Sequence, residues 1–104
     1  MHYGTGQWTF LGWQEEGEVV ACAGAEALGA RTVGIRSIAV APHWRGEGLG
    51  RSLIETLAER THAERVVAET DDDAVGFYRR CGFTAEDAPP KFGRPRYWCT
   101  QERD

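Results

Sequence analysis

The chain has 104 residues, 41% of them hydrophobic and 27% charged, with a formal net charge of −4. This length suits one compact domain, residues 1–104, and the composition is that of a globular protein rather than a disordered chain. The acidic balance argues against a nucleic-acid partner, and no stretch reaches the roughly 20 apolar residues that a membrane span needs. The first residues lack the basic and apolar regions of a secretory signal, so we expect a cytoplasmic protein.

The cysteines and histidines do not form a pattern that is typical of a metal site. Cys22, Cys81 and Cys99 lack CxxC spacing, and the three histidines are isolated from them and from one another. We expect free thiols and no metal. Cys22 and Cys99 lie in apolar runs, which predicts that both are small core residues.

The first 40 residues read as three strands. Residues 8–13 and 18–23 are separated by a turn at 15–17 and predict a hairpin. After a turn at Gly29, residues 32–40 predict a third strand, which is apolar on both faces at its end, as in a central strand. Pro42 cannot donate to a ladder, so the strand should end there.

The rest of the chain predicts two helices and three short strands. Residues 47–61 carry one apolar stripe at helical spacing, residues 65–70 form a strand, and Asp71–Asp73 should cap a second helix that Gly82 ends. Residues 83–85 and 96–100 predict late strands that a loop at Pro89–Pro90 separates. The sum is an α/β (α+β) domain with a mixed sheet and two covering helices.

The strongest functional signal lies between the third strand and the first helix. Glycines 46, 48 and 50 alternate with other residues there, between Arg45 and Arg51. A helix start leaves backbone N–H groups unpaired and carries partial positive charge, so it binds anions where no side chain blocks their approach. The glycines could instead serve only tight turn geometry. A Rossmann loop does not fit, because the spacing is GxGxG, and a Walker loop lacks its Gly-Lys-Ser/Thr.

Two segments together resemble known enzymes. Residues 38–50 are similar to the signature of the GNAT family of acetyltransferases, with Arg45, Gly48 and Gly50 in its fixed places. Residues 72–83 match a second family segment, including the Phe-Tyr-x-x-x-Gly-Phe pattern. The resemblance covers about residues 8–100, and two ordered motifs are more specific than one.

This resemblance implies a mostly antiparallel sheet with splayed strands and acetyl-coenzyme A as the acyl donor. The splayed strand would pair with the pantetheine arm through Ile38, Ala39 and Val40, and one N–H there would face the acetyl carbonyl. The side chains at 38 and 40 are equally explained as core. By position, the pyrophosphate falls to the turn and the helix start, namely Arg45, Gly46, Glu47, Gly48, Leu49, Gly50 and Arg51.

Two residues are implied in proton transfer. Tyr78 matches a tyrosine that protonates the departing thiolate, although it could also be a core tyrosine on an amphipathic helix. Glu69, at a strand end, is the candidate general base, with a solvated carboxylate or a substrate-charge anchor as alternatives. Asp71, where many members carry Asn, is interpreted as a helix cap.

The chain departs from the family at its start, where members usually carry a strand and two helices that wall the acceptor pocket. We expect an N-terminally shortened domain with a shallow acceptor site or with a wall from a second subunit, and therefore a homodimer. The predicted activity is acetyl transfer to a primary amine of a small molecule or protein. The alternative is an inactive acyl-coenzyme A sensor or regulatory module.

Overall fold

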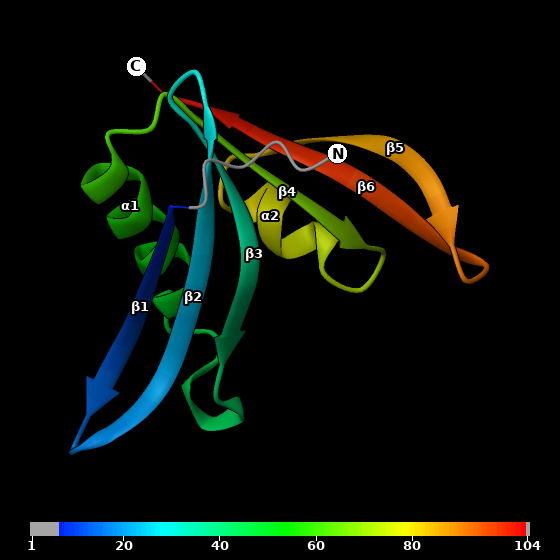
Figure 1. Ribbon diagram of the computed structural model, residues 1–104. Helices are drawn as coiled ribbons and strands as arrows, with labels where there is room; N and C mark the ends of the chain where they lie inside the picture. Colours follow the sequence, from blue (N-terminus) through cyan, green and yellow to red (C-terminus); the bar gives the residue numbers. More distant parts are fainter. Residues whose placement is uncertain (1–6, 104) are drawn as a thin grey trace.

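The computed structural model describes residues 7–103 (Figure 1). Its elements, in chain order, are β1 (Trp8–Glu15), β2 (Glu18–Gly29), β3 (Thr32–Val40), a 3₁₀ turn (Pro42–Trp44), α1 (Leu49–Thr61), β4 (Arg65–Asp71), α2 (Val75–Arg80), β5 (Thr84–Lys91) and β6 (Arg94–Glu102). Neither helix in this part of the chain is long and apolar enough to cross a membrane.

The six strands form one sheet in the order β1-β2-β3-β4-β6-β5. Four of the five neighbouring pairs are antiparallel, and only β3 and β4 run parallel. Parallel neighbours need a long crossover connection, and here that connection contains α1. The predicted mixed, mostly antiparallel sheet with two main helices is confirmed.

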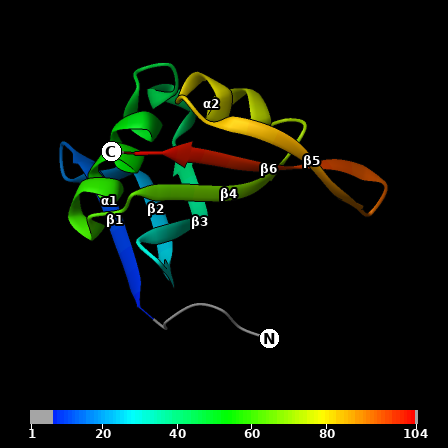
Figure 2. The same ribbon diagram turned by 90° about the horizontal axis from the view of Figure 1, so that it is seen from above.

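Both helices cover the same face of the sheet. The apolar stripe of α1, which includes Leu53, Ile54 and Leu57, is buried, and the helix packs on β1, β2 and β3. The shorter α2 packs on β5 and β6, and Tyr78 is buried there in the same core cluster as Cys99. Figure 2 shows the two helices beside these two halves of the sheet.

The opposite face of β1–β3 carries no described helix and exposes aromatic side chains. The Trp8 and Phe10 rings stack with their centroids 5.7 Å apart, and Phe10 is 71% exposed. Gly12 shares this face with Phe10, because alternate residues of a strand point to the same side. Cys22 pairs with Gly12 and therefore lies on the same face, where it is exposed. The prediction that Cys22 is a core residue is therefore wrong, whereas the same prediction for Cys99 is confirmed.

The sequence misplaced the last hairpin and some element ends. Pro89 and Pro90 lie inside β5 rather than in a loop, and β6 is longer than predicted at both ends. Because β5 is an edge strand, it has a neighbouring strand on one side only. A proline, which lacks an N–H group, costs no sheet hydrogen bond where it faces the open side. Its pairing with β6 is irregular between Ala88 and Lys91, which accommodates them. Helix α1 begins at Leu49, two residues later than predicted.

Candidate active site

A cleft opens where β3 and β4 separate. The two strands are paired only from Thr32 with Arg65 to Ile35 with Ala68. At the same point β3 carries a bulge, because Ile35 lies opposite Ala25 and Ser37 opposite Gly24, which leaves Arg36 without an opposing residue. A bulge bends its strand and re-aims side chains. Within residues 7–103, the last residues of β3 therefore pair only with β2, and those of β4 only with β6.

The cleft has a volume of about 900 Å³. Six of the predicted site residues line it: Ile38, Ala39, Val40, Arg45, Glu69 and Tyr78. The other six, residues 46–51, do not line the cleft and come directly after Arg45 in the sequence. Arg36, Asp73, Phe77 and Arg80 also line the cleft and were not predicted as site residues.

The backbone of β3 presents polar groups to this cleft. The Ala41 N–H donates to the Val20 carbonyl at 2.8 Å, so the polar groups of Ala41 face β2. Because successive residues of a strand alternate, those of Ile38 and Val40 face away from β2, into the cleft, and those of Ala39 face β2. The Val40 carbonyl accepts a hydrogen bond from Arg45 Nε at 3.1 Å. The side chains of Ile38 and Val40 pack against the core, which confirms the core interpretation, and the pairing of their backbone with the pantetheine arm stays a prediction.

The turn before α1 leaves its amides unobstructed. Gly46 and Gly48 have φ of +84° and +80°, a region that residues with a side chain rarely adopt. A Cβ atom on either glycine would meet no atom of the described residues within 4 Å, so the approach is open. Gly48 is the N-cap of α1, and no described side chain caps the start of this helix. The first N–H groups of α1 therefore remain available to an anion.

Tyr78 belongs both to the core and to the cleft. Its side chain packs edge-on against Phe77 and Phe83, with ring centroids 5.1 and 5.3 Å away. Burial raises the pKa of the Tyr78 phenol to about 12, and the Cys99 and Cys81 thiols contribute in the same direction. The phenol therefore keeps its proton through the physiological range, as a proton donor must.

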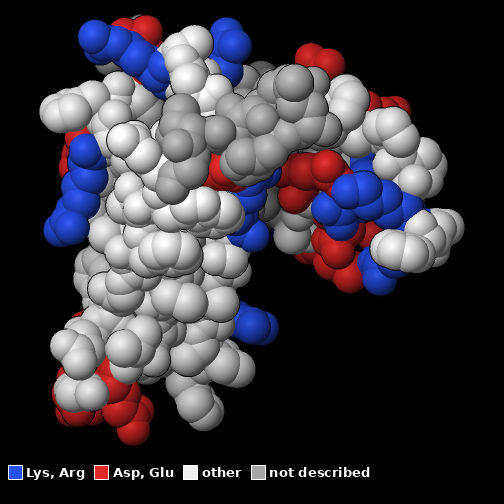
Figure 3. All heavy atoms as spheres, in the orientation of Figure 1, with Lys and Arg blue, Asp and Glu red and all other residues white. Residues whose placement is uncertain are grey.

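Glu69, the third residue from the end of β4, is held by two cations. Its Oε2 lies 2.8 Å from Lys91 Nζ on β5 and 3.1 Å from Arg96 Nε on β6. The hydrogen bond from Lys91 is the main cause of a lowered Glu69 pKa, which burial partly opposes and Arg96 reinforces. Figure 3 shows acidic and basic side chains gathered around the β5–β6 hairpin.

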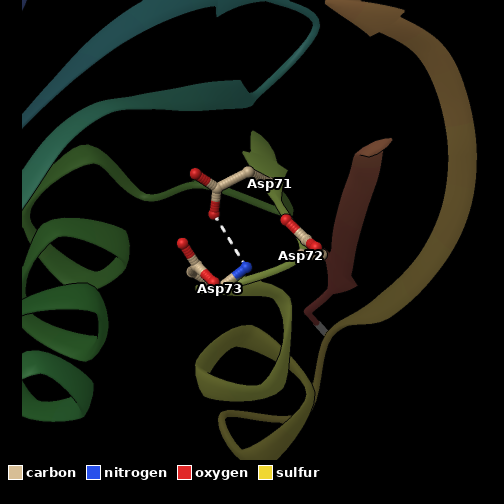
Figure 4. A group of neighbouring side chains, drawn as sticks. All are labelled: Asp71, Asp72 and Asp73. Carbon is tan, nitrogen blue, oxygen red and sulfur yellow. Dashed lines mark hydrogen bonds between the residues drawn. The ribbon is translucent and has the colours of Figure 1, made fainter. Parts of the chain in front are cut away.

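The three aspartates that follow β4 have different roles. Asp71 Oδ1 accepts a hydrogen bond from the Asp73 N–H at 3.1 Å (Figure 4) and another from the Ala74 N–H at 3.0 Å. Asp72 and Asp73 both bind Arg94 Nη2, at 2.8 and 2.9 Å. The N-cap of α2 is Ala74, so the prediction that an aspartate occupies that position is wrong, although Asp71 closes the turn just before it.

Sequence reasoning missed residues whose importance depends on distant partners. Lys91 and Arg96 meet Glu69 across the sheet, and Arg36 enters the site because of a bulge that pairing with β2 defines. The run around Arg36 reads as an uninterrupted strand, so no local pattern marks the bulge. The Phe-Tyr pair at 77–78 did carry a signal, but only Tyr78 was assigned a role.

Comparison with known proteins agrees with this geometry. A family model described as acetyltransferase (GNAT) family matches residues 2–83. A glucosamine 6-phosphate N-acetyltransferase of Trypanosoma brucei brucei is 35% identical over 63 residues, which are 57% of this chain and 43% of that protein. The chain thus spans less than half the length of this curated relative.

Solved structures share the fold. A GNAT acetyltransferase of Desulfovibrio desulfuricans superposes with a TM-score of 0.81 at 26% identity, over 91% of this chain and 68% of that one. An acetyltransferase of Salmonella typhimurium, solved with acetyl-coenzyme A, gives 0.73 at 25% identity, over 93% and 65% of the two chains. An aminoglycoside 6′-N-acetyltransferase complexed with coenzyme A gives 0.83 at 14% identity, over 94% and 74%, and shows the fold alone.

Proposed function

The chain belongs to the GNAT family of acetyltransferases, and on that basis we propose that it transfers an acetyl group from acetyl-coenzyme A directly to a primary amine. The observation that carries this proposal is the divergence of β3 from β4 after Ile35, together with the glycine turn that connects the end of β3 to α1. A divergent strand offers free backbone groups to an extended ligand, and the turn offers free amides to its phosphates.

The acyl donor would bind along this path. The turn and the start of α1, residues 45–51, would hold the pyrophosphate, with Arg45 and Arg51 adding positive charge. The cleft-facing groups of Ile38 and Val40 would pair with the amides of the pantetheine arm as a neighbouring strand would. Ala39 would contribute its side chain to the cleft wall rather than its backbone groups.

The reaction would proceed by direct attack of the neutral amine on the thioester carbonyl. The new N–C bond forms a tetrahedral intermediate, whose oxyanion would accept a hydrogen bond from the N–H of Ile38 or Val40. The C–S bond then breaks, and Tyr78 would give its proton to the departing thiolate. These steps yield the acetylated amine and free coenzyme A.

Glu69 would receive the proton that the attacking nitrogen loses, through a water molecule or directly. It lines the same cleft as Tyr78, which supports this role. Its two cationic partners and its lowered pKa oppose it, because a weaker base accepts a proton less readily. The same two features suit a carboxylate that anchors an ammonium group, so the anchoring role remains part of the proposal.

The second candidate function is an acyl-coenzyme A sensor that binds the donor without turnover. The pairing of Glu69 with Lys91 and Arg96 favours it, because this carboxylate is already neutralised. Both functions predict thermal stabilisation by coenzyme A, since a ligand that binds only the folded state stabilises it. Release of free thiol from acetyl-coenzyme A in the presence of an amine panel supports the enzyme, and its absence beside tight coenzyme binding supports the sensor.

The proposal includes a cytoplasmic homodimer and an acceptor that is a small-molecule or protein amine. The exposed Trp8 and Phe10 rings on the helix-free face support self-association, because apolar surface of this kind is commonly buried in an interface. Sedimentation at low micromolar concentration should give twice the monomer mass. A single species of monomer mass would contradict the dimer and leave the transfer chemistry in place.

A further inference from the structure

Arg36 lines the cleft at its apex, the point where β3 and β4 part, and lies on the face of the sheet opposite the helices. It lies at the bulge, one residue after Ile35, the last residue of β3 that pairs with β4. Its guanidinium lies near Gly34, with Cζ 3.4 Å from the position that a Cβ atom would occupy there. Gly34 alternates with the buried Val33 and Ile35, so Arg36 belongs to the helix-free face.

The guanidinium is oriented by a buried carboxylate. Arg36 Nε donates to Glu26 Oε1 at 3.1 Å, and the Glu26 side chain is 2% exposed, whereas that of Arg36 is 46% exposed. Among residues 7–103, no group accepts a hydrogen bond from either terminal nitrogen of Arg36. A guanidinium has five donors in a planar fork, so one edge is fixed and the other donors remain available to a ligand.

Glu69 holds the position on β4 that matches Arg36 on β3, one residue after the last pair between the two strands. It follows Ala68, the β4 partner of Ile35, and shares with Arg36 the face opposite the buried pair. Paired strands are about 4.8 Å apart, so the two residues flank the point where the strands part. The other cations around Glu69, Lys91 and Arg96, are already bonded to it. Arg36, although paired with Glu26 through Nε, therefore offers its terminal N–H donors at the position where an acceptor would meet the thioester.

We propose that Arg36 binds an anionic group of the acceptor, a carboxylate or a phosphate, and so selects an amine that carries a negative charge a few bonds from its nitrogen. The inference rests on the proposed function, which places the acceptor in this cleft. Bidentate contacts between a guanidinium and a carboxylate or phosphate are strong and directional, which gives selectivity as well as affinity. Glu69 would contact the amine end of the same molecule.

Matched acceptor pairs test this inference. Thiol release is measured with glucosamine 6-phosphate against glucosamine, and with α-amino acids against their amides, at equal concentrations of neutral amine. The first pair reports on phosphate and the second on carboxylate. For the wild-type protein, the anionic member of at least one pair should have the lower KM. Arg36→Gln should raise that KM about tenfold to a hundredfold and leave the neutral member nearly unchanged.

Two further variants and one binding measurement separate a loss of anion recognition from a loss of folding or of coenzyme A binding. Arg36→Lys keeps a cation beside Glu26 but loses the fork, so it should fold and show an intermediate KM. Arg31→Gln removes a remote, exposed arginine, which pairs with Glu64, and should change nothing. Coenzyme A affinity should be the same in all variants.

Two results overturn the inference in different ways. Equal KM values within both wild-type pairs, or an equal loss for both members in Arg36→Gln, would exclude anion recognition while the acetyl transfer stands. Absence of thiol release with every amine, despite coenzyme A binding, would reject the proposed function and the inference with it.

Discussion

A Cβ atom on Gly50 would lie 2.9 Å from both Cε1 and Cζ of Phe77. Gly50 is in the first turn of α1, and Phe77 lines the cleft beside Tyr78. The absence of a side chain at position 50 thus lets the start of α1 touch α2. This contact joins the proposed phosphate-binding end of α1 to the aromatic side chains around the proposed proton donor.

Substituting Gly50 with Ala should therefore disturb both stability and the cleft. The added methyl group would force the Phe77 ring to move, and overpacking of this kind costs about 1–3 kcal/mol in the free energy of unfolding. Gly76→Ala is the matched control, because a Cβ atom there meets only the mobile end of Arg80 at 3.3 Å. Chemical denaturation should show a loss for Gly50→Ala alone. Equal stability of the two variants would mean that the contact is not a constraint.

Tyr78→Phe should lower kcat about a hundredfold or more and leave acetyl-coenzyme A affinity nearly unchanged, because only the proton donor is lost. Steady-state kinetics and calorimetric binding of acetyl-coenzyme A check the two parts. A parallel loss of binding would assign Tyr78 a structural role.

The Tyr78 phenol should also titrate with a pKa of about 12, against about 10 for an ordinary tyrosine. Its raised folded-state pKa contributes stability that is complete below pH 10 and is lost as pH rises through about 12. Absorbance titration of the wild type and of Tyr78→Phe should differ by one phenol in that range. If Tyr78→Phe instead removes a phenol that titrates near pH 10, this result would contradict the burial of the Tyr78 hydroxyl.

Lys91→Met should raise the pKa of Glu69, because the Lys91 hydrogen bond is the main cause of its lowering. The depressed pKa contributes stability that is present above the unfolded-state value and is lost as pH falls through the folded-state value. Removing Lys91 should therefore move the carboxyl titration of Glu69, followed by carbon NMR, toward its ordinary value. Arg65→Met, which breaks the remote pair with Glu102, is the control and should leave Glu69 unchanged.

If Glu69 is the base, the acid limb of the pH–rate profile should shift to higher pH in Lys91→Met by the same amount as the carboxyl titration. A profile that stays in place while the carboxyl titration moves would assign Glu69 to anchoring instead.

Local patterns predicted the parts of the fold that local physics determines. The third strand has the predicted bounds, residues 32–40, because its apolar run ends at a proline, and the stripe of α1 is buried as expected. Gly46 and Gly48 have positive φ, which agrees with the tight turn geometry that is one interpretation of these glycines. The end of the second helix was likewise marked by Gly82, whose φ is +89°.

The rest depended on neighbours that sequence spacing does not reveal. Pro89 and Pro90 read as a loop, and only the edge position of β5 makes a strand possible there. Cys22 lies in an apolar run, yet it is exposed because no described helix covers its face. The aspartates read as caps, but Arg94 from the last hairpin binds two of them. Ion pairs and a bulge between distant segments thus determine much of the cleft around Arg36 and Glu69.

The central claim is that the backbone amides between residues 45 and 50 bind the coenzyme A diphosphate, and Gly48→Glu tests it most directly by calorimetric titration with coenzyme A. Gly17→Glu is the matched control, since Gly17 has a similar φ of +83°, equally open surroundings and a place in the distant β1–β2 turn. Both variants carry the same backbone strain, but only the first brings bulk and negative charge to the anion site. We expect Gly48→Glu to abolish binding and Gly17→Glu to retain the wild-type affinity. Unchanged coenzyme A affinity in folded Gly48→Glu would contradict the account.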